Sequence, residues 1–317
     1  MIILMYILAF LKNIINGTSV YFIGYLVESC DVLDVLSLRF LLGWTVLEIL
    51  KLTKVLKIEV GIKDCLGKTE RSKFLKPLIF AAIFEPVLYM FFETVGISMS
   101  TDVMTGVILS LTPIACVISE SIVLKEKNSP LENFFLLIGI VGVVYIAVNT
   151  GSNEGENSII GMLFVLAAVI SGALHMVFSR KASRNFRSME VTYFASFLGM
   201  IVFNTVNVIR HFACGDIADY FVPLMSTKNI IGFMFLAVIS TIVAAGMNNF
   251  ALTRIKVSTM SAFSGISSLV TIATGVILNN ESLYMYHYIG ISLIIIRMLG
   301  VCYLVYKEEN NGRELKA

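Results

Sequence analysis

Long runs of apolar residues follow one another along almost the whole chain, and short polar connections separate them. A helix needs roughly 20 apolar residues to cross about 30 Å of hydrocarbon. Segments 134–148 and 289–296 are apolar on every side, whereas the strands of a membrane barrel alternate apolar with polar residues. The pattern therefore predicts an all-α protein with ten membrane-spanning helices, at residues 3–26, 33–53, 76–97, 101–123, 131–149, 158–179, 189–210, 229–251, 257–278 and 284–306.

The overall composition agrees with a membrane protein and argues against other classes. Hydrophobic residues make up 57% of the 317 residues and charged residues only 15%, too few to cover a soluble protein of this size. The net charge of +2, without a basic tract interleaved with aromatic residues, predicts no nucleic-acid partner. The five cysteines are scattered without a C-x-x-C pair, so we expect free thiols, no metal site and no cofactor.

Basic residues are distributed unevenly between the connections. Of the 24 Lys and Arg residues, 19 follow the second, fourth, sixth and eighth runs or lie in the C-terminal tail. Only Arg210 and Lys228 lie in connections on the opposite side, and Lys12, Arg39 and Arg297 lie within runs. Because Lys and Arg accumulate on the cytoplasmic side of membrane proteins, the asymmetry predicts that both termini are cytoplasmic, in a multi-pass protein of the plasma membrane.

A weak internal repeat appears when the chain is shifted against itself by 155 residues. The shift aligns Glu126 with Glu281 and Glu93 with Asn248. Each unit holds five helices, an odd number, so the second copy enters the membrane from the opposite side. We therefore expect two inverted-topology repeats, at residues 1–150 and 155–308, followed by a cytoplasmic tail at 309–317.

Several short motifs occur in a fixed order along the two halves. They are Leu38-Arg39-Phe40-Leu41-Leu42, Leu111-Thr112-Pro113-Ile114, Glu126 and Gly142 in the first half, and Ser179-Arg180-Lys181, Asn249-Phe250-Ala251-Leu252, Glu281 and Gly290 in the second. Together they resemble the EamA-type branch of the drug/metabolite transporter superfamily, over residues 5–306. The resemblance implies a transporter of small metabolites and favours export. Three positions differ from the family pattern: Asn16-Gly17 replaces Trp-Gly, Ser268 replaces a proline and Arg297 replaces a small residue. The resemblance therefore does not identify the substrate of this protein.

Polar residues recur at helical spacing within four of the apolar runs, the first, third, sixth and eighth. The 155-residue shift pairs two of these runs with the other two, as a central cavity between repeats requires. The residues predicted to bind substrate in this cavity are Asn16, Ser19, Tyr89, Ser171, His175, Asn248 and Asn249.

Two of the ionisable residues inside the runs are candidates for proton coupling. An ionisable side chain at mid-bilayer costs about 3 kcal/mol on insertion scales, so each is expected to face protein or water. Glu85 is the most central carboxylate, and we predict that it couples transport to protons together with Lys12. The alternative is that the two residues form a buried ion pair.

The remaining charges within or next to the runs are interpreted as structural. Arg39 is expected to be an intramembrane anchor paired with Glu28, Asp31 or Asp34. Charges near the ends of runs are expected to be solvated or to mark helix boundaries. Glu93 and Asp102 belong to the first kind, and Glu126 and Glu281 to the second.

The predicted function is secondary transport of a small molecule, such as an amino acid or an amphipathic compound, by alternating access. The chain has no G-x-x-x-x-G-K-[ST] loop for ATP, and none of its three histidines begins a catalytic motif, so we expect no ATP-driven pump and no enzyme. A passive channel and a non-transporting scaffold or sensor are the alternatives, and a homodimer is left open.

Overall fold

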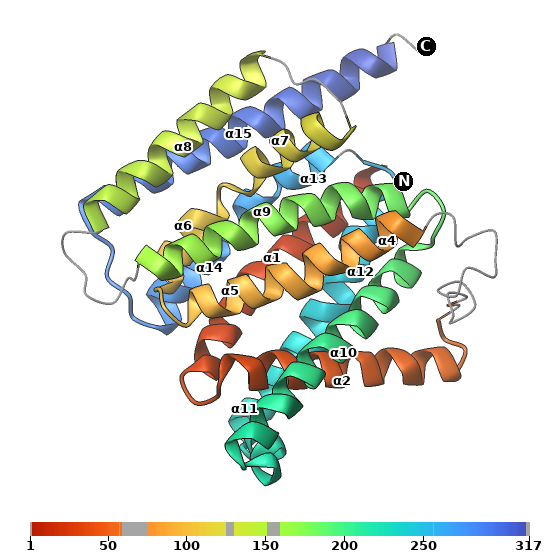
Figure 1. Cartoon of the computed structure of the whole chain (residues 1–317). Helices are drawn as coiled ribbons and strands as arrows, with labels where there is room; N and C mark the ends of the chain where they lie inside the picture. The colour runs from red at the N-terminus through yellow and green to blue at the C-terminus, as the bar shows by residue number, and fades with distance from the viewer. Residues whose placement is uncertain are drawn as a thin grey trace.

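The structure is a computed structural model that describes residues 2–56, 58, 75–124, 130–150, 159–255 and 257–314, and within these residues every regular element is a helix (Figure 1). The first half contains α1 (Ile2–Val27), α2 (Val32–Leu52), α4 (Leu75–Ala82), η2 (Ile83–Leu88), α5 (Tyr89–Ile97), α6 (Asp102–Leu109), α7 (Thr112–Leu124) and α8 (Pro130–Thr150). The second contains α9 (Ile159–Ala182), α10 (Ser188–Cys214), η3 (Ile217–Met225), α11 (Thr227–Met234), η4 (Phe235–Ala244), α12 (Ala245–Leu252), α13 (Val257–Ala262), α14 (Ser264–Leu278) and α15 (Met285–Glu314). Helices therefore occupy all ten predicted ranges, within a few residues at most ends.

Six of these helical stretches are long and apolar enough to cross a membrane. They are Leu4–Val27, Leu75–Ile97, Asp102–Val123, Ile159–Ala182, Ser188–Cys214 and Thr227–Leu252. Three further apolar stretches, Leu137–Ile146, Ser264–Leu278 and Met285–Gly300, are shorter. The structure thus confirms an all-helical chain with several apolar helices, and the count of ten spans stays a prediction.

The predicted third and eighth runs are interrupted by widened helical turns at equivalent places. In the third run, η2 separates α4 from α5: Glu85 has non-helical backbone angles (φ −144°, ψ 119°), and Pro86 lacks the N–H that a helix needs. In the eighth run, η4 separates α11 from α12. The 155-residue shift places residues 83–88 of η2 within η4. The repeat therefore extends from the sequence to the irregularities of the helices.

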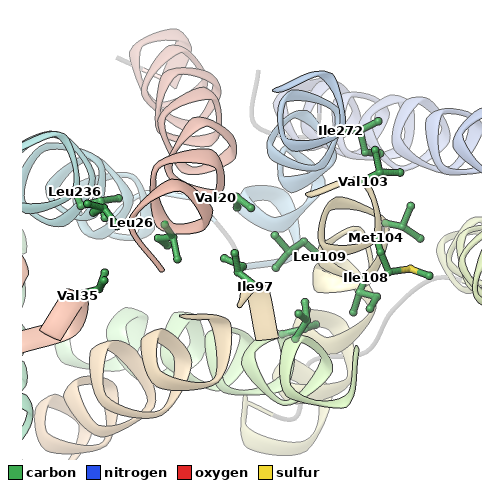
Figure 2. Packing of buried hydrophobic residues seen from close by; sticks show 14 of the residues in the cluster. Val20, Leu26, Val35, Ile97, Val103, Met104, Ile108, Leu109, Leu236 and Ile272 are labelled. Carbon is green, nitrogen blue, oxygen red and sulfur yellow. The ribbon is translucent and has the colours of Figure 1, made fainter. Parts of the chain in front are cut away.

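Hydrophobic side chains from both halves share one core. Its members on α1, α2, α5 and α6 pack with residues of η4 and α14 from the second half. Figure 2 shows part of this core, with Val20, Leu26, Val35, Ile97, Val103, Met104, Ile108, Leu109, Leu236 and Ile272 labelled. The two repeats are consequently packed into one body rather than joined as separate domains.

Helices α8 and α15 lie side by side along one edge of the molecule (Figure 1). They approach closely at two glycines: a Cβ added to Gly142 would lie 3.0 Å from the carbonyl oxygen of Gly290. Arg297 of α15 is 1% exposed, and its Nη1 donates to the carbonyl oxygen of Ser110, where α6 gives way to α7. Arg297 is thus held against a helix carbonyl group freed by an interruption.

Candidate functional site

A cavity of about 90 Å³ lies between helices of the two halves, with room for several water molecules. Nine of the ten intramembrane residues singled out from the sequence line it: Lys12, Asn16, Ser19, Arg39, Glu85, Tyr89, His175, Asn248 and Asn249. Ser171 is not among the lining residues, and its Oγ donates to the carbonyl oxygen of Ala167 at 2.9 Å. Ser171 thus lies outside the lining of this cavity, and the substrate-binding roles of the predicted residues stay predictions.

The cavity also has lining residues that the sequence prediction missed. The polar ones are Asn13, Glu93, Thr112, Thr192, Ser196, Ser240, Thr241, Ser264 and Ser267, and the apolar ones include Phe40, Met90, Leu109, Val169 and Met176. Thr192 and Ser196 are spaced by four within the seventh run, a signal that was present in the sequence. The apolar residues carried no comparable signal, because they resemble the rest of the spans.

Glu85 lies at the interruption in η2, opposite a histidine of the second half. Its Oε2 is 3.8 Å from Nε2 of His175, and Nδ1 of that ring lies 3.0 Å from the carbonyl oxygen of Ala81. Since a carbonyl group only accepts, Nδ1 carries a hydrogen and donates it. The other ring nitrogen, Nε2, faces the carboxylate.

Several polar groups of the cavity have no hydrogen-bond partner among the residues that the structure describes. The ammonium group of Lys12 and the side-chain amide of Asn16 make no hydrogen bond or ion pair with any residue in the described part of the chain. The Oδ1 atom of Asn248 is buried and has no hydrogen-bond partner there either. Buried polar groups in folded proteins are nearly always paired, so these groups are available to a ligand or to water.

Arg39 reaches across from α2 to the interrupted helix of the second half. Its Nε donates to Oγ1 of Thr241 and its Nη2 to Oγ of Ser240, both at 2.9 Å, and the residue is 1% exposed. The hydroxyl of Thr241 in turn donates to the carbonyl oxygen of Leu236 at 2.8 Å. The expected pairing of Arg39 with Glu28, Asp31 or Asp34 was wrong, because the widened turn of η4 offers it two hydroxyl groups.

Glu93 is buried in the cavity wall instead of lying at a solvated mouth. It is 4% exposed, and Oε1 accepts a hydrogen bond of 2.6 Å from the hydroxyl of Tyr89, one helical turn away. The ring of Tyr89 fits against α9 because Gly172 has no side chain: a Cβ there would lie 3.0 Å from the ring. This packing brings Tyr89 and Glu93 into the site together.

Asp102 is also buried, at 3% exposure, where a solvated position was expected. Glu281 accepts hydrogen bonds of 2.8 Å from the backbone N–H groups of Asp102 and Val103, so it caps the first turn of α6. Asn279 donates to Oδ2 of Asp102 at 3.0 Å. The interpretation of Glu281 as a boundary residue thus has a structural basis, whereas Glu126 lies outside the described residues.

Asn249 differs from its neighbour Asn248 because both ends of its amide group are engaged. Its Oδ1 accepts from Ser179 at 2.7 Å, and its Nδ2 donates to Thr192 at 2.9 Å. Asn249 thereby joins α12 to α9 and α10 at the edge of the cavity.

Comparison with known proteins gives a consistent result. The profile of the EamA-like transporter family matches residues 3–148 and again residues 159–303. The "uncharacterized transporter" YcxC of Bacillus subtilis strain 168 is 30% identical over 93% of this chain and 91% of its own length. The "uncharacterized transporter" YetK of the same strain is 25% identical over 89% of this chain and 81% of its own length. One crystal structure, 14% identical, has a TM-score of 0.65 over 96% of this chain and 98% of that one, which indicates a shared fold.

Proposed function

Because the chain belongs to the EamA-like transporter family, we propose that it is a secondary transporter of small polar or amphipathic metabolites, such as amino acids, and that it works by alternating access. The observation that carries this proposal is the cavity between the two halves. Polar groups that have no partner among the described residues face it, apolar side chains form part of its wall, and two helices are interrupted beside it at equivalent positions. Secondary transporters commonly bind their substrates at such a repeat interface.

We further propose that both termini are cytoplasmic and that transport runs outward across the plasma membrane. The distribution of Lys and Arg between alternate connections supports this orientation. The resemblance to exporters supports the direction.

Proton coupling is assigned to Glu85, with Lys12 in the same cavity. The 3.8 Å approach of Glu85 to Nε2 of His175 supports this assignment, because either group can hold a proton that the other then balances. Substrate that enters the cavity would compete with the proton for Glu85. The ammonium group of Lys12, which lacks a hydrogen-bond partner within the described residues, places a positive charge in the same cavity.

The decisive test is counterflow in proteoliposomes. Vesicles with purified protein are loaded with one unlabelled compound at a time, from panels of amino acids, sugars and cationic drugs, and uptake of the labelled compound is measured. We expect saturable counterflow for at least one amino acid or amphipathic compound. Flux that does not saturate would indicate a channel, and the absence of flux for every compound would favour a scaffold or sensor.

The coupling assignment has its own test in the variant Glu85→Gln. Glutamine keeps the shape of the side chain but does not ionise. Counterflow should therefore persist, while stimulation of uptake by a pH gradient should be lost. The matched control is Glu48→Gln, since Glu48 pairs with Lys51 and Tyr193 away from the cavity and should leave the response intact. An unchanged gradient response in Glu85→Gln would overturn the assignment.

A further inference from the structure

A second polar cluster joins the two halves, where the start of α2 meets the end of α10. Three nitrogens converge on Oδ1 of Asp34: Nε2 of His211 at 2.9 Å, Nη2 of Arg210 at 2.8 Å and Nδ2 of Asn207 at 2.9 Å. Nδ1 of His211 lies 2.9 Å from Oδ1 of Asp216, and Nη1 of Arg210 donates to Asp31. We call Asp31, Asp34, Arg210, His211 and Asp216 the outer cluster, because the proposed topology puts it on the extracytoplasmic side.

The local sequence explains why Asp216 folds back onto the histidine. Helix α10 ends at Gly215, which adopts left-handed backbone angles (φ 77°, ψ 17°) that glycine accepts without strain. The chain then reverses, and the backbone N–H of Asp216 donates to the carbonyl oxygen of His211 at 3.1 Å. This closure places an acceptor at Nδ1, on the opposite side of the ring from Asp34.

His211 is therefore held between two carboxylates, one on each ring nitrogen, and is 4% exposed. An ionised carboxylate only accepts hydrogen bonds, so the ring satisfies both partners only as an imidazolium, with a hydrogen on each nitrogen. A neutral ring has one donor and leaves one carboxylate facing a lone pair. One of the two bonds between His211 and its carboxylates thus depends on this proton, whereas the bonds that Arg210 and Asn207 donate to Asp34 do not.

Other titratable and charged groups also face the ring. Arg210 approaches Nε2 to 3.0 Å from α10, and the ring of Tyr220 in η3 lies 5.4 Å away, centroid to centroid. Asp31 precedes α2 and is paired with Arg210, and Cys30 lies in the turn between α1 and α2. The cluster contains three carboxylates and the one guanidinium, so a positive charge on the imidazole brings it closer to balance.

The outer cluster connects directly to the cavity through α2. Asn207, which binds Asp34, also donates to Oγ of Ser37 at 2.8 Å, and Asn204 donates to the carbonyl oxygen of Ser37 at 3.1 Å. Arg39, two residues further along α2, lines the cavity. Helix α2 therefore contributes residues both to the outer cluster and to the cavity wall.

We propose that the outer cluster is a proton-operated lock, in which protonated His211 holds α2 of the first half against α10 of the second, and loss of that proton releases them. The direction of the pH response follows from the number of N–H donors on the ring of His211. In mildly acidic solution the imidazolium bridges both carboxylates, and as pH rises the neutral ring loses one bond and its charge. This device is separate from the transport cycle proposed above and does not depend on the identity of a substrate.

The test measures the distance between the turn that leads into α2 and the last part of α10 by pulsed electron resonance on protein in lipid nanodiscs, where both faces see the same pH. Spin labels are placed at Ser29→Cys and Val208→Cys after the five native cysteines are replaced. Between about pH 5.5 and about pH 9, the wild-type background should pass from one narrow distance to a longer or bimodal distribution. A distribution that does not change over this range would overturn the proposal.

Two variants and one control identify the group responsible. His211→Asn should give the longer distribution at every pH, and retention of the wild-type response would overturn the proposal. If His211→Asn fails to fold, Asp216→Asn removes the negative charge beside Nδ1 of His211 but keeps an oxygen there. This variant should open the lock at a lower pH than wild type, and an unshifted response would again contradict the lock. His287→Asn is the matched control: His287 is 3% exposed at the start of α15, accepts a bond from a backbone N–H and should leave the response unchanged.

Discussion

The cavity and the outer cluster both bring charged residues of the two halves together, but they differ in how completely these residues are paired. In the outer cluster, one oxygen of Asp34 accepts from three nitrogens and both nitrogens of His211 are engaged. In the cavity, Lys12, Asn16 and Asn248 have polar atoms without partners in the described part of the chain. The charged groups of the outer cluster are thus paired, although Oδ1 of the neighbouring Asn207 has no partner within the described residues. Paired charges stabilise a particular arrangement, whereas unpaired polar groups lower stability and persist where they bind something.

This difference predicts that the outer cluster contributes strongly to stability, and Asp34→Ala should have the largest effect of the changes considered. Removing Asp34 leaves His211 and Arg210 without their common acceptor, and breaking a buried charged pair costs about 3–5 kcal/mol. The free energy of unfolding in mixed detergent micelles, followed by circular dichroism, measures the loss. The matched control is Asp31→Ala, whose side chain is 72% exposed and whose removal should cost less than about 1 kcal/mol. Equal effects of the two variants would contradict the comparison.

The sequence was informative about the cavity and almost silent about the outer cluster, for a physical reason. A polar residue inside an apolar run stands out, and helical spacing groups such residues on one face; nine of the residues that line the cavity were found in this way. Asp34 and His211 lie near helix ends, where charged residues are ordinary, and they are 177 residues apart in the chain. Arg210 was interpreted only as a loop charge that helps to set orientation. Nothing local to these residues predicts that they meet.

The fold itself was more predictable than the contacts within it. Hydropathy gave the ranges of the helices because burial in lipid requires long apolar runs. The proline after Glu85 marks the interruption in the third run. Helix η4 contains no proline or glycine, so its sequence gives no sign of the widened turn, where the hydroxyl of Thr241 donates to the carbonyl oxygen of Leu236 five residues earlier. Pairing of Arg39 was mispredicted for the same reason, since its partners lie in that turn.

The cavity offers the opposite test in Lys12→Met. Methionine keeps the length of the side chain and removes a charge that lacks a hydrogen-bond partner within the described residues, so the free energy of unfolding should rise by about 1–2 kcal/mol. Counterflow in proteoliposomes should fall at the same time, because the charge serves the site rather than the fold. Lys51→Met is the control: Lys51 donates to Tyr193 at 2.8 Å outside the cavity, and its loss should leave counterflow intact. A loss of stability in Lys12→Met would indicate that Lys12 is structural.

The smallest expected effect concerns two adjacent residues, Asn248 and Asn249, which repeat the contrast within one turn of α12. Asn248→Ala removes an unpartnered acceptor, so substrate affinity should fall by about 0.5–1.5 kcal/mol, or about two- to tenfold, with unfolding unaffected. Asn249→Ala breaks bonds to Ser179 and Thr192, so it should lower the free energy of unfolding by a similar amount. Titration calorimetry with a compound identified by counterflow, together with unfolding of both variants, separates the two roles. Asn248→Ala with wild-type affinity would remove Asn248 from the binding site, and the inverse result for both residues would mean that pairing does not distinguish binding residues from structural ones.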